Sequence, residues 1–378
     1  MEFDFVIVGA GAAGCVLASR LSEEGRHTVA LVESGGADRS PLIHCPAGMA
    51  VIARTRTAAR AYHTVPQAGL LGRRGYQPRG HALGGSTSVN AMCYARGQPA
   101  DYDGWAAMGC EGWAWQDVRP YFLRAEHNER LQDEWHGQQG PLHISDLRSP
   151  NPFSAHFIEA AVQAGHVRND DFNGPRQEDV GYYQVMQRDG ERCSAARAYL
   201  TPYLRRANLQ VLTDARAMKL QLRDGAPPVV DVLQGGRPLQ LRARREVVLC
   251  AGSLESPALL LRSGVGPGEH LQSLGIVTAR HLPGVGSNLH DHPHVVLVAD
   301  APGQHALFGV SPTGAWRMLR ALGEWRRQRT GLLTTNFAEA GGFIRSRPEV
   351  GAPDIQLDFV VAQLLGHGRR AAAGPGLL

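Results

Sequence analysis

The chain has 378 residues, of which 43% are hydrophobic and 20% charged, and its formal net charge is +4 at pH 7. This composition predicts a globular protein of more than one domain and excludes a disordered chain. The arginines are scattered or paired, as at Arg73 and Arg74, and no basic run is interleaved with aromatic residues. We therefore expect no nucleic acid as a partner.

The cysteines and the hydrophobic pattern indicate the cellular compartment of the protein. Six cysteines lie far apart without a C-x-x-C pair, which predicts neither a zinc site nor a disulfide framework. The first strand begins near Phe3 and leaves no room for a signal peptide. No stretch reaches the roughly 20 apolar residues of a transmembrane helix. We expect a cytoplasmic protein without a transmembrane segment.

The N-terminal sequence predicts a strand, a glycine-rich turn, a helix and a second strand. Residues 3–14 read FDFVIVGAGAAG, in which an apolar strand leads into G-x-G-x-x-G. A helix is predicted over residues 12–24 and a strand over residues 28–33. Such a unit binds the ADP part of a dinucleotide, because the glycines permit a tight turn, close approach of a pyrophosphate and close helix packing.

The candidate ligands of this unit fall into two groups. The turn and helix N-terminus offer free N–H groups to phosphates, and the candidates there are Gly9, Gly11, Ala12 and Gly14. Glu33, at the end of the second strand, is the candidate acceptor for the ribose hydroxyls. An acidic residue at this place repels a 2′-phosphate, which disfavours NADP.

Further elements follow in chain order. Residues 36–83 are predicted to form an extended excursion punctuated by prolines, and residues 84–92 a tight turn or the start of a helix. The remaining predicted elements are helices over 115–125, 153–164 and 254–262 and strands over 209–212, 229–233, 246–249 and 355–361. Ser154 is the predicted cap at the start of the second of these helices.

Two long motifs decide between the dinucleotides. Arg79–Asn90 reads RGHALGGSTSVN, and Gly252–Pro267 reads GSLESPALLLRSGVGP. Together with Asn288, Asp291 and His292 they resemble the glucose–methanol–choline (GMC) family of FAD-dependent oxidoreductases, of the choline dehydrogenase and acceptor-linked alcohol dehydrogenase type. The resemblance runs over nearly the whole chain.

The resemblance implies an α/β fold with two domains. The FAD-binding domain is Rossmann-like and discontinuous, with residues 1–152 and 193–297. The smaller substrate domain is α+β, comprises residues 153–192 and 298–378, and is built on an antiparallel sheet that we expect to be incomplete at the C-terminus. The family's catalytic histidine segment would lie beyond Leu378, so the catalytic residues are unknown.

The resemblance also implies where FAD binds. To the residues of the first unit it adds candidate cofactor ligands in the later motifs: Gly84, Gly85, Ser86, Asn90, Ala217, Ala251 and Gly252. Val89 stands where some relatives carry the histidine that bonds covalently to the flavin, so we expect non-covalent FAD. His81 departs from the basic or small polar residue that the motif usually has there.

The implied reaction is oxidation of an alcohol by hydride transfer from its CH–OH carbon to flavin N5. The partners would be a small-molecule alcohol and an electron acceptor, which is oxygen, a quinone or a carrier. Choline is doubtful as the substrate, because Glu339, Trp316, Phe337 and Phe343 form no recognisable cage for a quaternary ammonium.

Alternatives remain open at this point. The chain could be a truncated or frame-shifted FAD-binding fragment without turnover, and we expect such a product to bind FAD poorly or to be insoluble. An NAD-linked dehydrogenase is a third hypothesis. His290, His292 and His294 alternate as metal ligands on a strand would, but the family loop explains them more simply, and we expect no metal.

Overall fold

A computed structural model describes residues 1–299 and 312–362 of the chain. Contacts between residues divide the chain into two compact units, each made of separate segments. Unit 1 consists of residues 1–39, 58–89 and 194–295, and unit 2 of residues 40–57, 90–193 and 296–378.

These units differ from the predicted domains in the N-terminal half of the chain. Residues 40–57 and 90–152, assigned from the sequence to the cofactor domain, belong to unit 2. Strand pairing accounts for much of this, because Cys93–Tyr94 pairs with Gln184–Val185 within unit 2. The functional division into cofactor and substrate domains stays a prediction.

The elements of unit 1 follow the predicted alternation of strands and helices. Its strands are β1 (Glu2–Val8), β2 (Val29–Val32), β3 (Ala59–His63), β4 (Tyr76–Gly80), β12 (Leu209–Leu212), β13 (Ala215–Arg223), β14 (Ala226–Gln234), β15 (Arg237–Leu249), β16 (Val265–Gly266) and β17 (Arg280–His281). Its helices are α1 (Ala12–Leu21), the 3₁₀ segments Ala68–Leu70, Gly85–Ser88 and Thr201–Tyr203, the π-helical segment Ala196–Leu200, α7 (Gly252–Arg262) and α8 (Gly268–Ser273).

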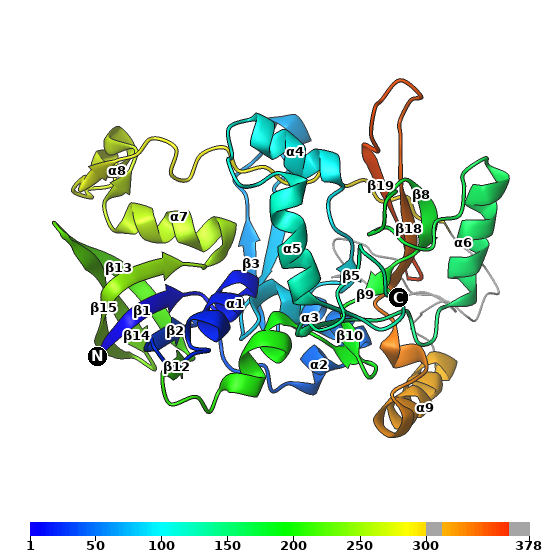
Figure 1. Cartoon of the computed structure of the whole chain (residues 1–378), viewed down its shortest axis with the longest axis horizontal. Coiled ribbons are helices and arrows are strands. Elements are labelled where there is room, and N and C mark those ends of the chain that lie inside the picture. Colours follow the sequence, from blue (N-terminus) through cyan, green and yellow to red (C-terminus); the bar gives the residue numbers. More distant parts are fainter. Residues whose placement is uncertain (300–311, 363–378) are drawn as a thin grey trace. The chain divides into compact units, whose positions relative to one another are not determined.

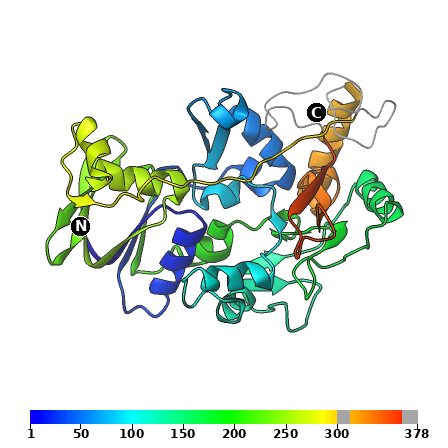
Figure 2. The ribbon, with the colours of Figure 1, turned by 90° about the horizontal axis from the view of Figure 1, so that it is seen from above.

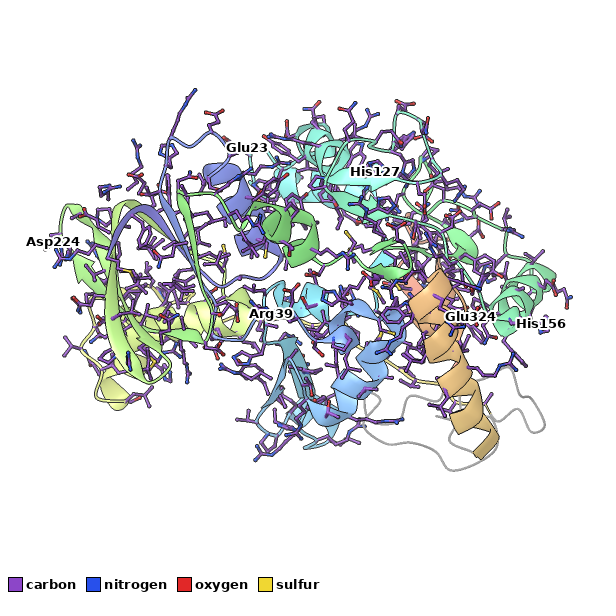
Figure 3. The ribbon with its side chains drawn as sticks, turned by 90° about the horizontal axis from the view of Figure 1, so that it is seen from below. Glu23, Arg39, His127, His156, Asp224 and Glu324 are labelled. Carbon is purple, nitrogen blue, oxygen red and sulfur yellow. The ribbon has the colours of Figure 1, made fainter. Side chains whose placement is uncertain are left out.

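Six strands of unit 1 form one sheet in the order β12-β2-β1-β15-β14-β13. The first four are parallel, and β14 and β13 continue the sheet as antiparallel strands. Helix α7 lies against β13, and α8 follows beside it (Figures 1 and 2). Asp224 marks the exposed turn between β13 and β14 (Figure 3). This topology confirms the predicted Rossmann-like α/β fold.

Several predicted elements of unit 1 are corrected in extent. Strand β15 has 13 residues rather than the short run predicted over 246–249, and β13 was not predicted. Both alternate buried and charged residues along an antiparallel meander, which weakens the apolar signal of a strand. Residues 36–83 are not one extended excursion, since they contain the β3–β4 hairpin and four helical segments.

The core of unit 1 lies on the sheet, with fully buried Val6, Val230 and Leu241 among its members. Leu241 is central to β15 and pairs with Val230. We predict that Leu241→Ala lowers the free energy of unfolding by about 2–5 kcal/mol, because it removes buried methyl groups and leaves a cavity. Leu222→Ala on β13, where the leucine is 38% exposed, is the control and is expected to change it by less than about 1 kcal/mol. Urea unfolding measures the free energy of unfolding of both variants, and an equal decrease in the two would contradict this view of the core.

Unit 2 is built from shorter elements. Its helices are α2 (Pro41–His44), α3 (Met49–Thr55), α4 (Pro99–Ala107), α5 (Trp115–Ala125), α6 (Pro152–Gln163), α9 (Pro312–Gln328) and the 3₁₀ segments Pro46–Gly48 and Leu332–Thr334. Its strands are β5 (Cys93–Tyr94), β6 (Glu126–Asn128), β7 (Leu142–Ile144), β8 (Asp179–Tyr182), β9 (Gln184–Val185), β10 (Gln187–Arg188), β11 (Glu191–Arg192), β18 (Ala338–Ile344) and β19 (Ile355–Val360).

The antiparallel sheet predicted for the second domain is present in unit 2. It has the order β19-β18-β8, and α6 packs against all three strands (Figure 1). The N-cap of α6 is Asn151, whose Oδ1 accepts the Phe153 N–H at 3.0 Å, rather than the predicted Ser154. Phe157 of α6 stacks on Phe359 of β19 with 4.9 Å between ring centroids.

A buried ionic network stabilises unit 2. His136 lies between two carboxylates, with its Nδ1 3.1 Å from Glu126 Oε1 and its Nε2 3.0 Å from Asp171 Oδ2. Arg96 donates to the other oxygen of Glu126. Burial lowers the pKa of His136, but the hydrogen bonds and charges of Asp171 and Glu126 prevail and raise it to about 9. His136 is therefore an imidazolium at neutral pH, and both of its ring N–H groups donate.

This network predicts a loss of stability at alkaline pH. A raised folded-state pKa contributes stability below the unfolded value near 6.5, and that contribution disappears as the pH rises through about 9. We expect the free energy of unfolding to fall by up to about 3 kcal/mol over this range. His136→Gln should abolish the dependence, and His156→Gln, at an exposed position on α6 (Figure 3), should keep it. Urea unfolding followed by tryptophan fluorescence from pH 6 to about pH 10 measures the slope, and an identical slope in the His136 variant would contradict the assignment.

Candidate functional site

The candidate site lies where two neighbouring parallel strands of unit 1 end and each is followed by a helix. β1 pairs in parallel with β2 on one side and with β15 on the other, and Val8 lies opposite Leu249 where β1 and β15 end. After β1 the chain turns into α1, and after β15 it turns into α7. Ligands of open α/β sheets bind in the crevice at such a switch point.

A cavity of ≈ 520 Å³ opens at these carboxyl ends. Both helix N-termini line it, with Ala12 and Ala13 of α1 and Gly252 and Ser253 of α7 exposed to it. Neither helix has a side-chain cap at its N-terminus. Because the first N–H groups of a helix have no partner within the helix, two sets of donors and two positive dipole ends meet in one cavity. The cavity is therefore suited to a ligand with phosphate groups.

Gly9 and Gly14 are required by the packing of the protein itself. Gly9 has φ +102°, and a Cβ there would lie 2.5 Å from the carbonyl oxygen of Cys250, just beyond β15. A Cβ on Gly14 would lie 1.8 Å from the carbonyl oxygen of Gly9. The turn can thus pass between β15 and α1 only without side chains at these two positions.

Gly11 differs from these two glycines. Its φ is −76°, and a Cβ there would come no closer than 3.9 Å to another part of the protein. The fold therefore leaves room for a methyl group at Gly11, and that room faces the cavity. This is the position at which close approach of a ligand, rather than packing, requires glycine.

The second motif packs directly on the first turn. The N–H of Gly84 donates to the carbonyl oxygen of Ala10 at 2.8 Å. A Cβ on Gly85, whose φ is +54°, would lie 2.7 Å from Cα of Gly11. Gly85–Ser88 is a 3₁₀ turn, which resolves the predicted choice between turn and helix, and Gly85 and Ser86 line the cavity.

Glu33 lies buried at the end of β2 and lines the same cavity. Its Oε2 accepts the N–H of Ala10 at 2.9 Å, and its Oε1 accepts the N–H of Gly35 at 2.7 Å. Oε1 also accepts the hydroxyl of Ser34 at 3.4 Å, whereas Oε2 keeps a second lone pair. The side chain is thus fixed by the first turn and keeps acceptor capacity for a ribose hydroxyl.

The structure places most of the other predicted ligands at this cavity. Ala217 on β13 and Ala251 and Gly252 at the start of α7 line it. Asn90 belongs to unit 2, where its carbonyl oxygen and Oδ1 accept from Nη1 of Arg192 at 2.8 and 2.9 Å. Its predicted role at the cofactor stays a prediction.

The cavity residues that were not predicted as ligands include a connected group of polar side chains. Arg60 and Tyr62 lie on β3, His81 follows β4, and Glu255 lies in the first turn of α7. Tyr62 donates its hydroxyl to Glu255 Oε1 at 2.7 Å, and Arg60 Nη1 lies 3.5 Å from the same oxygen. No sequence signal could reveal this group, because β3 and α7 are far apart along the chain.

His81 is a neutral acceptor in this group. Burial, assisted by the charge of Arg60, lowers the pKa of His81. Its Nε2 lies 3.0 Å from Nη2 of Arg60, and since arginine can only donate, Nε2 accepts. At the motif position where the family usually has a basic or small polar residue, the positive charge is thus supplied by Arg60 from the neighbouring strand.

Other predicted candidates lie outside this cavity. His290, His292 and His294 lie in an exposed segment without strand structure, so the alternation expected on a strand does not arise. Among residues 1–299 and 312–362, no three histidine, cysteine or acidic side chains are grouped to hold a metal ion. Within the same part of the chain, no helix has the length and apolar character to cross a bilayer.

Of the candidate choline ligands, Glu339 is engaged within unit 2. Glu339 is 1% exposed, and its oxygens accept the Asn151 N–H at 2.6 Å and the hydroxyls of Ser154 and Thr335 at 2.9 and 2.6 Å. Its carboxylate is therefore engaged at the N-terminus of α6. The side chain of Trp316 lies outside the described residues.

Comparisons with known proteins agree with the architecture. Residues 3–294 match the family model described as GMC oxidoreductase. The chain is 41% identical to an alcohol dehydrogenase [acceptor] of Pseudomonas putida, over 99% of this chain and 68% of that protein. It is 40% identical to an oxygen-dependent choline dehydrogenase of Rhizobium rhizogenes, over 100% of this chain and 68% of that protein.

Solved structures show the same fold. A crystal structure of formate oxidase superposes with a TM-score of 0.82 at 26% identity, over 97% of this chain and 69% of the other. Pyridoxine 4-oxidase from Mesorbium loti gives a TM-score of 0.70 at 37% identity, over 74% of this chain and 55% of the other. The chain thus spans between about half and two thirds of the length of these relatives.

The contrast between Gly11 and Gly14 gives a prediction for two matched variants. Gly14→Ala should lower the free energy of unfolding by about 2 kcal/mol or more, because its Cβ overlaps a backbone oxygen. Gly11→Ala should change it by less than about 1 kcal/mol. Both variants should lose affinity for ADP, measured by calorimetry. An unaltered ADP affinity in Gly11→Ala would show that no ligand approaches this turn.

Proposed function

Because the chain belongs to the GMC oxidoreductase family, we propose that it takes part in the FAD-dependent oxidation of an alcohol. One observation carries the proposal for this chain. The two helix N-termini, the glycine turn and Glu33 line one cavity at the switch point of the sheet. This donor set fits the diphosphate and ribose of an adenine dinucleotide.

Different described residues would bind different parts of FAD. The N–H groups at the start of α1 and α7 would hold the diphosphate, Glu33 a ribose hydroxyl, and the backbone at Ala217 the adenine. Gly85 and Ser86 would lie along the remainder of the cofactor. Val89 has no nucleophilic atom, so we propose that binding is non-covalent.

The flavin, when bound, supplies hydride acceptance from the CH–OH carbon, and the protein supplies orientation and exclusion of water. Loss of the hydroxyl proton needs an acceptor whose pKa lies near the working pH. His81 lines the cavity, but its Nε2 already accepts from Arg60. We therefore assign no described residue to proton acceptance.

For the substrate we propose an uncharged primary alcohol in preference to choline. A quaternary ammonium is bound by aromatic faces or by a carboxylate that faces it. Both oxygens of Glu339 instead accept hydrogen bonds from the protein itself. The electron acceptor would be oxygen, a quinone or another carrier.

A second candidate function is FAD binding without turnover. It is favoured by the lack of an assigned proton acceptor among the described residues. The expectation of weak FAD binding or insolubility stays a prediction. A single preparation of the purified chain can distinguish the two candidate functions.

The test is the visible spectrum of the purified 378-residue chain during anaerobic titration with primary alcohols and with choline. The proposed function predicts visible absorption bands of oxidised flavin. These bands should bleach with an uncharged alcohol at lower concentrations than with choline. Bound flavin that no alcohol bleaches would favour the second candidate. A chain that FAD does not stabilise against heat but NAD does would contradict both.

A further inference from the structure

The β3–β4 hairpin forms part of the wall of the cofactor cavity. Its two strands pair only with each other. A two-stranded hairpin is marginally stable in water by itself. Contacts between the hairpin and the rest of unit 1 therefore determine how firmly this wall of the cavity is positioned.

At its base the hairpin is joined to the second motif. The N–H of Gly80 donates to Ser86 Oγ at 3.1 Å. The N–H of His81 donates to the carbonyl oxygen of Ala58 at 2.7 Å and so extends the pairing of the two strands by one step. These bonds lie where β3 begins and β4 ends. They leave the middle of β3 to be held by side chains.

Side chains from the middle of β3 reach across to α7. Tyr62 donates to Glu255 Oε1 at 2.7 Å, and Arg60 Nη1 lies 3.5 Å from that oxygen. All three residues line the cavity. We refer to Arg60, Tyr62 and Glu255 as the clasp. It joins the hairpin to the helix whose N-terminus faces the proposed phosphate site.

The charges around Glu255 favour a closed clasp. Burial raises the pKa of Glu255, but the Tyr62 hydrogen bond and the charges of Arg262, Arg60 and Arg216 together lower it. Arg262 Nη2 lies 3.7 Å from Glu255 Oε2. Glu255 is thus an anion among cations on the wall of a cavity proposed to bind an anionic ligand. Without the clasp, its charge would face that ligand with less compensation.

We propose that Tyr62, Arg60 and Glu255 are positioning residues that retain the cofactor, so that closing this clasp across the cavity sets the rate at which FAD leaves. The inference rests on the proposed function, since it needs FAD in this cavity. The clasp acts through the hairpin and α7, and it takes no part in electron transfer. Its loss should therefore alter cofactor release more than the spectrum of the bound flavin.

The test is the rate of FAD release from the full chain, followed by the rise in flavin fluorescence after dilution. Tyr62→Phe and Glu255→Met, which removes the acceptor, should each release FAD roughly tenfold faster, the effect of one partly exposed hydrogen bond to a charged group. The double variant should release it no faster than the faster single variant, because both changes open the same contact. Arg60→Gln, which keeps the Tyr62–Glu255 bond, should have a smaller effect.

Matched controls in unit 1 are Tyr203→Phe and Glu23→Met. Tyr203 packs on Arg206, and Glu23 pairs with Arg20 after α1 (Figure 3). Both should release FAD at the rate of the unaltered chain. Equal release from all variants, or additive effects in the double variant, would overturn the clasp while leaving the proposed function intact. An unaltered chain that binds no FAD would instead overturn the proposed function, and the clasp with it.

Discussion

The parallel pairing of β1 with β15 is the constraint on which the rest of the site depends. It brings the turn after β1 so close to the backbone of Cys250 that position 9 has no space for a side chain. The same pairing ends β1 and β15 together, so that the N-termini of α1 and α7 both line one cavity. Glu33 then fixes the turn through the N–H of Ala10. Phosphate binding is thus a consequence of strand order.

Polar contacts have different roles in the two units. In unit 2, His136 and its carboxylate partners are buried, so their charges stabilise the fold and make it sensitive to pH. In unit 1, the contacts of Glu255 lie at the wall of a cavity and are partly exposed. They contribute little to overall stability, but they join the β3–β4 hairpin to α7.

The sequence was informative where function depends on local backbone geometry. The turn from Gly9 to Gly14, the helix at 115–125 and the start of α7 were all predictable from short-range patterns. Strand β13 and the clasp were not, because each depends on partners distant in the chain. The assignment of residues 90–152 differed for the same reason, since strand pairing within unit 2 is invisible to local periodicity.

The family model and the relatives support an FAD-dependent oxidoreductase, and the central physical claim is narrower: the switch-point cavity of unit 1 binds the diphosphate of an adenine dinucleotide. Hydrogen exchange of the backbone amides, with and without FAD, tests it most directly. The account predicts that added FAD slows exchange at residues 10–14 and at residues 252–255. Protection confined to other segments, or no protection at these two helix N-termini when FAD is bound, would contradict it.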